Sequence, residues 1–500
     1  MQTRDWLIAA SPPTPNGDLH VGHIAGPYLS SDVFRRARRR LGDTAAHVSY
    51  ADDNQSYVVT TARRRGLPPE QLMDHYNQEI QATLAAFDIG LDSFARPDDE
   101  QNAAVGEAVR TLVAAGLVVE KQVPELYDAQ TQTPLYESFV SGGCNVCLRP
   151  TKGGVCEACG HPNDPIDLLG PRIDTRLANV HPTGVTRRLV LPVEDYREAL
   201  LAYYREKRGR WRPHVLQLVD EVLSHPLPDY PISHPGSWGI PVGLPGWENN
   251  VVNVWAEIGL AFLHQLARHR NADAIAAGTY VQFLGFDNSY AFAVAHPVLQ
   301  FALERAGAGP AKLPHTIFTN EFYHLEHRKF STSQGHAIWA RDLLEHLSAD
   351  EARFYLSLHA PELAEGNFEL DAAHAALKRD LHVPLATVRA RLSEIANSRQ
   401  APIASGSPSV LDAVDRRVRL FSAPESFSVR GLASGVRDWL AYLASVEVDP
   451  GDPSEAGTFL AGLNYWAEVA SIMMPKLAAE VASQTASCTR VSDAAPAPVR

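Results

Sequence analysis

Short apolar runs that lead through glycine-containing loops into helices occur twice in the chain. The run Trp6–Ala10 leads through a Pro/Gly/Asn loop into a helix that begins near His20, and a second run follows at Ala45–Tyr50. Strand, loop, helix and strand in this order predict a βαβ unit. The run Thr279–Leu284 repeats the pattern and precedes an apolar helix over Tyr290–Leu303. We therefore expect one parallel, nucleotide-binding sheet whose two halves are separated in sequence.

A change of pattern marks the other parts of the chain. The segment between the two halves has its own turns, prolines and a cysteine cluster, and from about Leu370 the pattern becomes helical and rich in Ala, Leu and Arg. The fold class is therefore α/β with a helical bundle. The expected division is 1–115, first half of a Rossmann-type catalytic domain; 116–230, connective insertion; 231–369, second half; 370–483, helical bundle; and 484–500, a disordered tail in which Cys488 is an exposed, inert thiol.

Composition and charge narrow the class of protein. Of 500 residues, 45% are apolar and 21% charged, which is typical of a packed globular chain. No apolar stretch reaches membrane-spanning length, and the N-terminus lacks a signal-peptide pattern, so we expect a soluble, cytoplasmic protein without a membrane partner, and a monomer. The net charge of -13 argues against an unstructured, electrostatic binder of nucleic acid.

Four of the five cysteines form two Cys-x-x-Cys pairs within the insertion. A distributed disulfide framework is thereby excluded. Two such pairs separated by eight residues have the spacing of a zinc knuckle, in which four thiolates close a tetrahedral structural site with no open position for catalysis. The predicted Zn²⁺ ligands are Cys144, Cys147, Cys156 and Cys159.

Two polar motifs carry candidate chemistry for a phosphate chain. In PNGDLHVGH, Gly22 allows backbone to approach a ligand, and His20 and His23 lie three residues apart on a first helical turn, where both can face a phosphate. In KFSTSQG, Lys329 stands near Ser331 and Ser333 in a polar loop able to close over a triphosphate. The two motifs in this order are far more specific than either alone.

In this order the motifs resemble the HIGH and KMSKS signatures of the class I aminoacyl-tRNA synthetases. Four further strings narrow the resemblance to the methionyl-tRNA synthetases: ADD at 51–53, ISHPGSWGIPV at 232–242, VWAE at 254–257 and FLGFD at 283–287. The resemblance extends to about Val481 and implies that the chain forms an aminoacyl adenylate from ATP with Mg²⁺. It also implies a zinc knuckle in the insertion.

The resemblance assigns roles to individual residues. His20 and His23 would stabilise the pentavalent phosphate, and Lys329 the leaving pyrophosphate. Asp53 would receive the α-ammonium group of the amino acid. The ATP-binding positions are Gly22, Gly285, Asp287, Ser331 and Ser333, with Asp287 on the ribose; the amino-acid-binding positions are Pro12, Thr14, Asp53, Trp255, Ile258, Phe262, Asn288 and Phe292.

The amino-acid pocket departs from the pattern of the methionyl-tRNA synthetases. Pro12 and Thr14 stand where those enzymes have an apolar residue and a tyrosine, Ile258 replaces an alanine, and Phe292 replaces a histidine. The added bulk predicts a shallower pocket for glycine, alanine or another small amino acid. Alternatively, Pro12 and Thr14 add to the pocket the volume that Ile258 and Phe292 remove, which would leave room for methionine after repacking.

Phosphate-binding charges are reduced as well. Thr332 and Gln334 replace the second lysine of KMSKS and the arginine that usually follows it. His234 stands where an arginine is usual, and Phe286 where a lysine is usual. All four changes predict weaker electrostatic stabilisation of pyrophosphate and slower adenylation.

Features that would recognise tRNA are weak. The first bundle helix offers Thr387 and Arg391 where the family uses an asparagine and an arginine, and Val448–Asn464 lacks the Pro-Trp pair. From Asp371 onward there are 13 basic against 14 acidic residues, so the bundle has no excess of positive charge to follow phosphates. The arginine runs 36–40 and 63–65 are expected to be solvated helix faces.

Three functions remain after this comparison. The first is ATP-dependent activation of a small amino acid, such as glycine, and its transfer to a small-molecule acceptor. Similar synthetase-like domains work in natural-product pathways; in hydrazine synthetases one loads an amino acid onto the hydroxylamine oxygen of an N-hydroxylated lysine alongside a zinc cupin, which here would have to be a separate partner. The second is a methionine-tRNA ligase, and the third is a non-catalytic paralogue.

Overall fold

A five-stranded parallel sheet with the order β16-β15-β1-β2-β3 forms the centre of the computed structural model. The structure describes residues 3–128, 130, 134–173, 178–179, 181–268, 272–325, 328–329, 338–398 and 410–490. Because β1 pairs with β2 on one side and with β15 on the other, the two separated halves form one sheet, and the predicted α/β fold is confirmed. Its strands are β1 (Asp5–Ala10), β2 (Thr44–Tyr50), β3 (Ser93–Ala95), β15 (Thr279–Gly285) and β16 (Thr316–Asn320).

Helices cover both faces of this sheet, which explains why β1 is apolar and buried from Trp6 to Ala10. Alternate residues of β1 enter different cores: Trp6 and Ile8 lie in one, Leu7 and Ala9 in the other. Helices that flank the sheet and its site are α2 (Leu29–Arg40), α3 (Ser56–Arg65), α4 (Pro69–Ala86), α5 (Asp99–Ala114), α8 (Val254–Ala267), α10 (His296–Arg305) and α12 (Ala349–Leu358).

The insertion has a β-rich part and a helical part. Its longest antiparallel pairing joins β4 (Val119–Tyr127) to β11 (His181–Leu191), and β12 (Tyr230–Pro231) extends this sheet. Helices α6 (Arg197–Arg205) and α7 (Pro213–Leu223) contribute to the same core as Leu7 and Ala9 of the central sheet. The smaller strands around the cysteines are β5 (Val140–Gly143), β6 (Pro150–Lys152), β7 (Gly154–Val155), β8 (Pro162–Asn163), β9 (Leu169–Ile173) and β10 (Ala178–Asn179).

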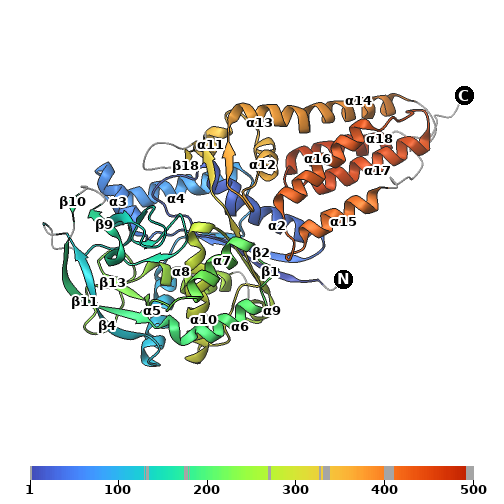
Figure 1. Cartoon of the computed structure of the whole chain (residues 1–500). Helices are drawn as coiled ribbons and strands as arrows, with labels where there is room; N and C mark the ends of the chain where they lie inside the picture. Colours follow the sequence, from blue (N-terminus) through green and yellow to red (C-terminus); the bar gives the residue numbers. More distant parts are fainter. Residues whose placement is uncertain are drawn as a thin grey trace, which may run out of the picture.

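The C-terminal helices form a bundle that lies to one side of the central sheet (Figure 1). They are α13 (Leu370–Leu377), α14 (Val383–Asn397), α15 (Leu411–Ser422), α16 (Val429–Ser445), α17 (Pro453–Ala470) and α18 (Pro475–Arg490). Helix α18 therefore includes residues 484–490 of the expected tail. Cys488 is buried, with its Sγ 3.7 Å from the carbonyl oxygen of Leu392 in α14, so the expectation of an exposed thiol was wrong. The reason is helical spacing, because Val481, Thr485 and Cys488 all lie on the buried face of α18.

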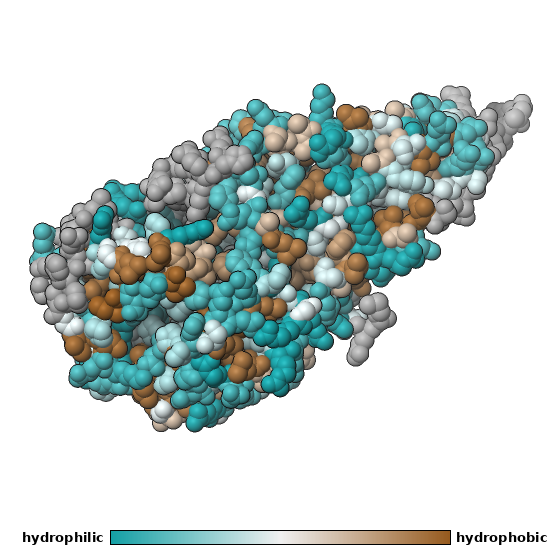
Figure 2. Space-filling model, in the orientation of Figure 1, coloured by the Kyte–Doolittle hydropathy of each residue, from teal (hydrophilic) through white to brown (hydrophobic). Residues whose placement is uncertain are grey.

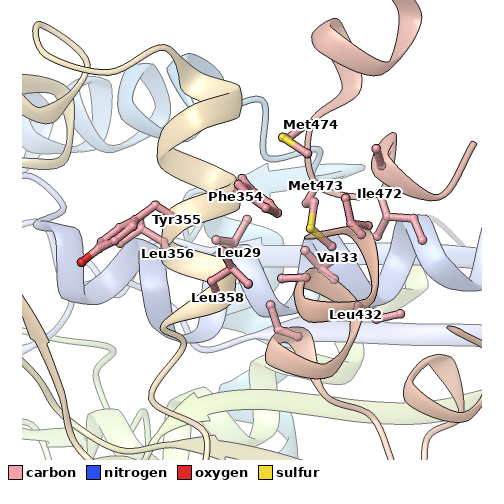
Figure 3. Packing of buried hydrophobic residues seen from close by; sticks show 14 of the residues in the cluster. Leu29, Val33, Phe354, Tyr355, Leu356, Leu358, Leu432, Ile472, Met473 and Met474 are labelled. Atoms are coloured by element: carbon pink, nitrogen blue, oxygen red, sulfur yellow. The ribbon is translucent and has the colours of Figure 1, made fainter. Parts of the chain in front are cut away.

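The bundle shares one hydrophobic core with the catalytic part of the chain. Figure 3 shows Leu29 and Val33 of α2 packed between Phe354 of α12 and the segment Ile472–Met474 that joins α17 to α18. This continuity fixes the bundle rigidly against the first helix that follows the histidine motif.

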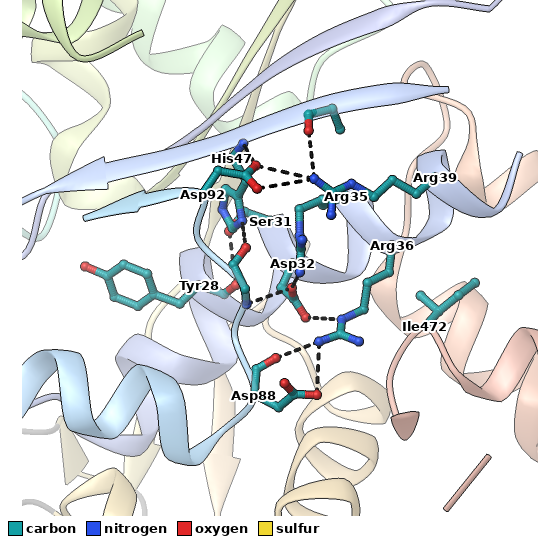
Figure 4. Close-up of polar contacts among 12 residues, drawn as sticks. Tyr28, Ser31, Asp32, Arg35, Arg36, Arg39, His47, Asp88, Asp92 and Ile472 are labelled. Carbon is teal, nitrogen blue, oxygen red and sulfur yellow. Dashed lines mark hydrogen bonds and ion pairs between the residues drawn. The ribbon is translucent and has the colours of Figure 1, made fainter. Parts of the chain in front are cut away.

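An ion-pair network centred on Asp32 reinforces the same contact. The Asp32 carboxylate is fully buried and accepts hydrogen bonds from Arg35 at 2.8 Å, Arg36 at 2.7 Å and Arg353 at 2.7 Å. Arg353 is also fully buried, and it donates to the carbonyl oxygens of Phe87 and Met473 at 3.0 and 2.8 Å. Figure 4 shows the surrounding contacts, including Arg36 with Asp88.

The arginine run 36–40 was expected to be a solvated face, and for most of it the structure contradicts this. Arg38 pairs with Asp43 and donates to the carbonyl oxygen of Ser422, and Arg40 pairs with Asp415 and Glu468. Acidic partners from distant segments neutralise these charges, which the local sequence could not show. The second run, Arg63–Arg65, is exposed as expected.

None of the helices in the described part of the chain combines the length and the apolar character that crossing a membrane requires. On the face seen in Figure 2, hydrophilic residues surround small hydrophobic patches.

Candidate active site

Two connected cavities open at the carboxyl ends of β1 and β15. This is where neighbouring strands of a doubly wound sheet diverge and ligands of such sheets bind. The first cavity measures about 340 Å³ and is lined by the histidine motif, by 285–288 and by 320–323. The second cavity measures about 160 Å³. Residues that line both are Pro12, Thr14, Tyr57, Glu157, Asp287 and Asn288.

The two histidines form a compact unit on the first cavity. His20 is the N-cap of the short helix α1 (Val21–His23), and the rings of His20 and His23 stack with centroids 3.7 Å apart. Each Nδ1 accepts a hydrogen bond from the other residue's backbone N–H at 3.3 Å. A neutral ring whose Nδ1 accepts carries its proton on Nε2, so the Nε2 atom of each ring is an N–H donor. Gly22, between them, also lines the cavity, as the sequence predicted.

A π-helical turn follows the site loop in each half of the sheet. The turn Ile24–Tyr28 follows the histidines, and the turn Ala291–Ala295 follows Asp287 and Asn288. Such turns rotate the backbone locally and are frequent at functional sites. At the first turn the chain passes so close to Asn320 of β16 that a Cβ on Gly26 would lie 2.7 Å from its amide nitrogen. A larger residue at this position would therefore require the Asn320 side chain to move.

Asp287 stands on the boundary between the two cavities. Asn288 donates to its Oδ1 at 3.0 Å. A Cβ on Gly285 would lie 2.5 Å from the same oxygen, so only glycine leaves room for this carboxylate. The structure thus brings Gly285, Asp287 and Asn288 together with the histidines, as predicted.

The catalytic loop lies mostly outside the described residues. The backbone of Lys329 belongs to β18 (Arg328–Lys329), which pairs with β17 (Tyr323–Leu325) next to the first cavity. The predictions for Ser331, Thr332, Ser333 and Gln334 concern residues that the structure does not describe.

Asp52, rather than Asp53, is the carboxylate that the structure places at the second cavity. Asp53 accepts hydrogen bonds from Asn77 at 2.7 Å and Arg96 at 2.8 Å and lines neither cavity. Asp52 is buried, accepts a hydrogen bond from Thr14 Oγ1 at 2.9 Å and lines the second cavity. Burial, helped by the charge of Glu137, raises the pKa of Asp52 to about 7. Adjacent aspartates after a strand point in different directions, so the motif alone did not decide between them.

Bulky apolar side chains bound the second cavity. Ile258 and Phe292 are 2% and 3% exposed and line it together with Pro12, Thr14 and Trp255. The Phe292 ring packs edge-on against His296, whose Nε2 donates to the carbonyl oxygen of Trp255 at 2.8 Å. Phe262 does not line the second cavity but a separate small cavity with Tyr280 behind Phe292, and its predicted contact with the amino acid stays a prediction.

Several lining residues had no sequence signal. Gln55 and Glu137 line the second cavity, and Tyr57 and Glu157 line both. Glu157 stands between Cys156 and Cys159, so the cysteine loop itself reaches the site. Two carboxylates of the insertion therefore border a site that motif analysis had assigned to the catalytic halves alone.

The substitutions at His234 and Phe286 have different settings. Phe286 lines the first cavity, and its ring stacks on that of His214 with centroids 3.5 Å apart. A phenylalanine where a lysine is usual leaves that cavity with one positive charge fewer. His234 does not line the first cavity. Its ring stacks on that of Tyr136 with centroids 3.8 Å apart, and it lines a third cavity. Of the two residues, only Phe286 lines the first cavity, and weaker phosphate electrostatics there stays a prediction.

The four clustered cysteines come together as predicted. Their Sγ atoms all lie within 4.8 Å of one another, Cys144 and Cys156 being buried. Backbone N–H groups of Val146 and Cys147 donate to Cys144 Sγ at 3.3 and 3.5 Å. Converging donors of this kind stabilise a thiolate, so the cluster is suited to hold a metal ion.

Comparison with known proteins agrees with these features. A model of the family described as tRNA synthetases class I (M) matches residues 6–393. The chain belongs to this family. Methionine-tRNA ligases of Thermomicrobium roseum and Kineococcus radiotolerans are 32% and 31% identical, covering 71% and 72% of this chain. Those matches cover only 62% and 64% of the relatives, so this chain spans less than two thirds of their length.

A solved structure shows the same synthetase fold. The methionyl-tRNA synthetase of Mycobacterium tuberculosis, in complex with methionyl-adenylate, aligns with a TM-score of 0.73 at 20% identity. The alignment covers 96% of this chain and 93% of that chain.

The two bundle residues that the resemblance placed at tRNA-recognition positions, Thr387 and Arg391, form hydrogen bonds within the bundle. Thr387 Oγ1 donates to the carbonyl oxygen of Val383 in its own helix, at 3.2 Å. Arg391 donates to the carbonyl oxygen of Leu443 at 2.6 Å, which ties α14 to α16. Trp439 and Trp466 are buried in the bundle core.

Proposed function

We propose that the chain activates a small α-amino acid with ATP and transfers the aminoacyl group to a small-molecule acceptor such as a hydroxylamine. The observation that carries the proposal is the pair Ile258 and Phe292, buried at the second cavity where an alanine and a histidine are expected for methionine. A close-packed wall does not yield to a longer side chain without strain.

The connected cavities give each substrate a place. The amino acid would occupy the second cavity with its ammonium group at Asp52, and ATP would occupy the first cavity with its ribose at Asp287. A carboxylate oxygen of the amino acid then attacks the α-phosphorus, and the bond to the bridging oxygen of pyrophosphate breaks. The Nε2–H donors of His20 and His23 stabilise negative charge on the phosphate as it develops. Lys329 and the Mg²⁺ that accompanies ATP would neutralise the departing pyrophosphate.

The second candidate function is methionine-tRNA ligation. It is favoured by the relatives from T. roseum and K. radiotolerans, which carry that name. It requires Pro12 and Thr14 to provide the volume that Ile258 and Phe292 remove. It also requires tRNA contacts other than Thr387 and Arg391, since both are engaged within the bundle.

The acceptor separates the two functions. Purified protein is given ATP, each amino acid in turn, and either bulk tRNA or N6-hydroxylysine. An ester formed only with N6-hydroxylysine supports the proposal, whereas efficient methionylation of tRNA would establish the second candidate. Absence of ATP-pyrophosphate exchange with every amino acid would instead indicate the non-catalytic paralogue. A separate cupin partner stays a prediction from the resemblance.

The double variant Ile258→Ala, Phe292→His is expected to shift preference towards methionine. The parent protein should activate glycine or alanine better than methionine, since a small pocket rejects a long side chain by volume, and a single methylene corresponds to about 10- to 200-fold in kcat/KM. ATP-pyrophosphate exchange with each amino acid measures the preference. The matched control is Val294→Ala, which removes volume from the same π-turn without lining the cavity. Unchanged preference in the double variant contradicts the assignment.

We also propose that the four cysteines bind one Zn²⁺. Metal analysis should find about one zinc per chain, and Cys147→Ser should lose it and expose the loop around Glu157 to limited proteolysis, because binding free energy of a structural metal contributes to folding. Cys488→Ser is the control, since that thiol lies in the bundle. Chelator-washed protein that contains no zinc and unfolds at an unchanged temperature would refute this site.

A further inference from the structure

A third cavity of about 130 Å³ lies beside the second, between the insertion and the catalytic halves. The two share three lining residues, Glu137, Val155 and Trp255. The third cavity does not share residues with the histidine motif or with 285–288. A molecule held there would therefore be next to the amino-acid site and away from the nucleotide.

Three buried polar atoms on this cavity have no hydrogen-bond partner among the described residues: Glu137 Oε1, Tyr230 Oη and His234 Nδ1. Glu137 and Tyr230 are 6% and 4% exposed, yet Glu137 Oε1 and Tyr230 Oη accept and donate no hydrogen bond there. The other carboxylate oxygen of Glu137 accepts from Ser56 Oγ at 2.8 Å. Buried polar atoms are almost always paired, so unpaired ones on a cavity indicate a ligand that completes them.

The backbone of Glu137 is also strained. Its φ is +42°, in the left-handed region that residues other than glycine rarely adopt. Such strain persists where the surrounding structure enforces it and is concentrated at functional sites. The strained residue here is the one that lies between the two cavities.

The charges on the third cavity favour a cation. Its one guanidinium, Arg188, is already engaged by Glu125 at 2.8 Å and by Asp164 at 2.5 Å. Asp229 is paired with Lys121 at 2.5 Å. Asp167 is exposed at the rim, and no described residue pairs with its carboxylate. Between these acidic groups the walls are apolar and aromatic, with Val155, Pro162, Pro165, Tyr230 and Tyr290.

We infer that the third cavity is the acceptor site and takes a small aliphatic molecule with a terminal amine or hydroxylamine group. Its alkyl chain would lie along the proline and tyrosine walls, one cationic group would be bound by Asp167, and the reacting heteroatom would lie at Glu137. The inference deepens the proposed function and rests on it for the transfer step.

Glu137 is placed to receive the proton that the transfer releases. The nucleophilic nitrogen or oxygen of the acceptor forms a bond to the carbonyl carbon of the aminoacyl adenylate, the bond from that carbon to the phosphate oxygen breaks, and AMP leaves with the electron pair. The proton lost by the nucleophile passes to Glu137. Burial raises the pKa of Glu137 to about 7, although the polar groups of Ser56 and Trp255 beside it oppose the rise, so the carboxylate is a competent base near neutral pH.

Binding of 1,5-diaminopentane to the full-length protein tests the site without requiring catalysis. Calorimetry should show binding that Asp167→Lys weakens tenfold or more and that the neutral analogue 1,5-pentanediol does not reproduce. Asp195→Lys is the matched control, because it reverses an exposed charge outside the cavity. Failure of the diamine to bind, or equal affinity in both lysine variants, overturns the inference.

Transfer assays then test the role of Glu137. With the amino acid that gives the best ATP-pyrophosphate exchange, Glu137→Gln should lower transfer to N6-hydroxylysine about 10²- to 10⁴-fold relative to exchange in the same sample. Equal loss of transfer and exchange would refute the proton-accepting role. Absence of exchange in the parent protein would refute the proposed function instead, and the calorimetric result would still decide the binding site.

Discussion

Replacing His20 or His23 with alanine is expected to lower ATP-pyrophosphate exchange about 10²- to 10³-fold. Each ring supplies one Nε2–H donor on the first cavity, and loss of one positioned donor to transition-state charge has an effect of this size. The comparison is made at saturating ATP and amino acid, so that the loss appears in kcat. His374→Ala, an exposed histidine of the bundle, is the control.

A second variant separates chemistry from structure at His20. Because His20 also caps α1, its removal could act by loosening the helix start. Asparagine is an excellent N-cap but has no imidazole. His20→Asn should therefore keep the parent's thermal stability and still lose exchange; full activity in this variant would show that the ring serves only as a cap.

Replacing Arg353 with methionine is expected to lower the free energy of unfolding by about 3–5 kcal/mol. The change leaves the buried Asp32 carboxylate undercompensated and removes donors from the carbonyl oxygens of Phe87 and Met473. Urea denaturation followed by tryptophan fluorescence measures the change. Arg379→Met is the control, because its guanidinium is 70% exposed and its pair with Asp380 should contribute less than about 1 kcal/mol.

The same network predicts acid sensitivity. Burial alone would raise the pKa of Asp32, but Arg353, Arg36 and Arg35 outweigh it and hold the pKa well below its usual range. A carboxylate whose pKa is lowered by folding stabilises the folded state at any pH above its pKa in the unfolded chain, which is about 4. This stabilisation is lost as the pH falls below that value. The stability difference between the parent protein and Asp32→Asn should therefore narrow below about pH 4. A difference that stays constant from pH 7 to pH 3 would contradict the network.

The fold and the phosphate-facing part of the site followed from sequence because both depend on local patterns. The side chains of β1 enter the two cores in alternation, and Gly285 leaves room for Asp287. Both features depend on residues that are neighbours in the chain. The rest depended on distant partners. The sequence could not show that Asp43 pairs with Arg38. Nor could it show that Arg96 binds Asp53 and leaves Asp52 at the cavity, or that His234 stacks on Tyr136. Glu137 belongs to no sequence motif. Its place at the site became visible only in the structure, where the insertion packs against the two halves of the central sheet.

Placement of β1 between β2 and β15 also constrains the order in which the protein can fold during its synthesis. Residues 5–10 are synthesised before both of their pairing partners, and one partner, residues 279–285, follows only after the whole insertion. Parallel pairing over such a distance is slow, because the intervening chain must be ordered before the contact forms. The unpaired edge of β1 therefore stays exposed to aggregation throughout translation of the insertion, and a nascent chain arrested before residue 279 should depend on chaperones more than one released after residue 320.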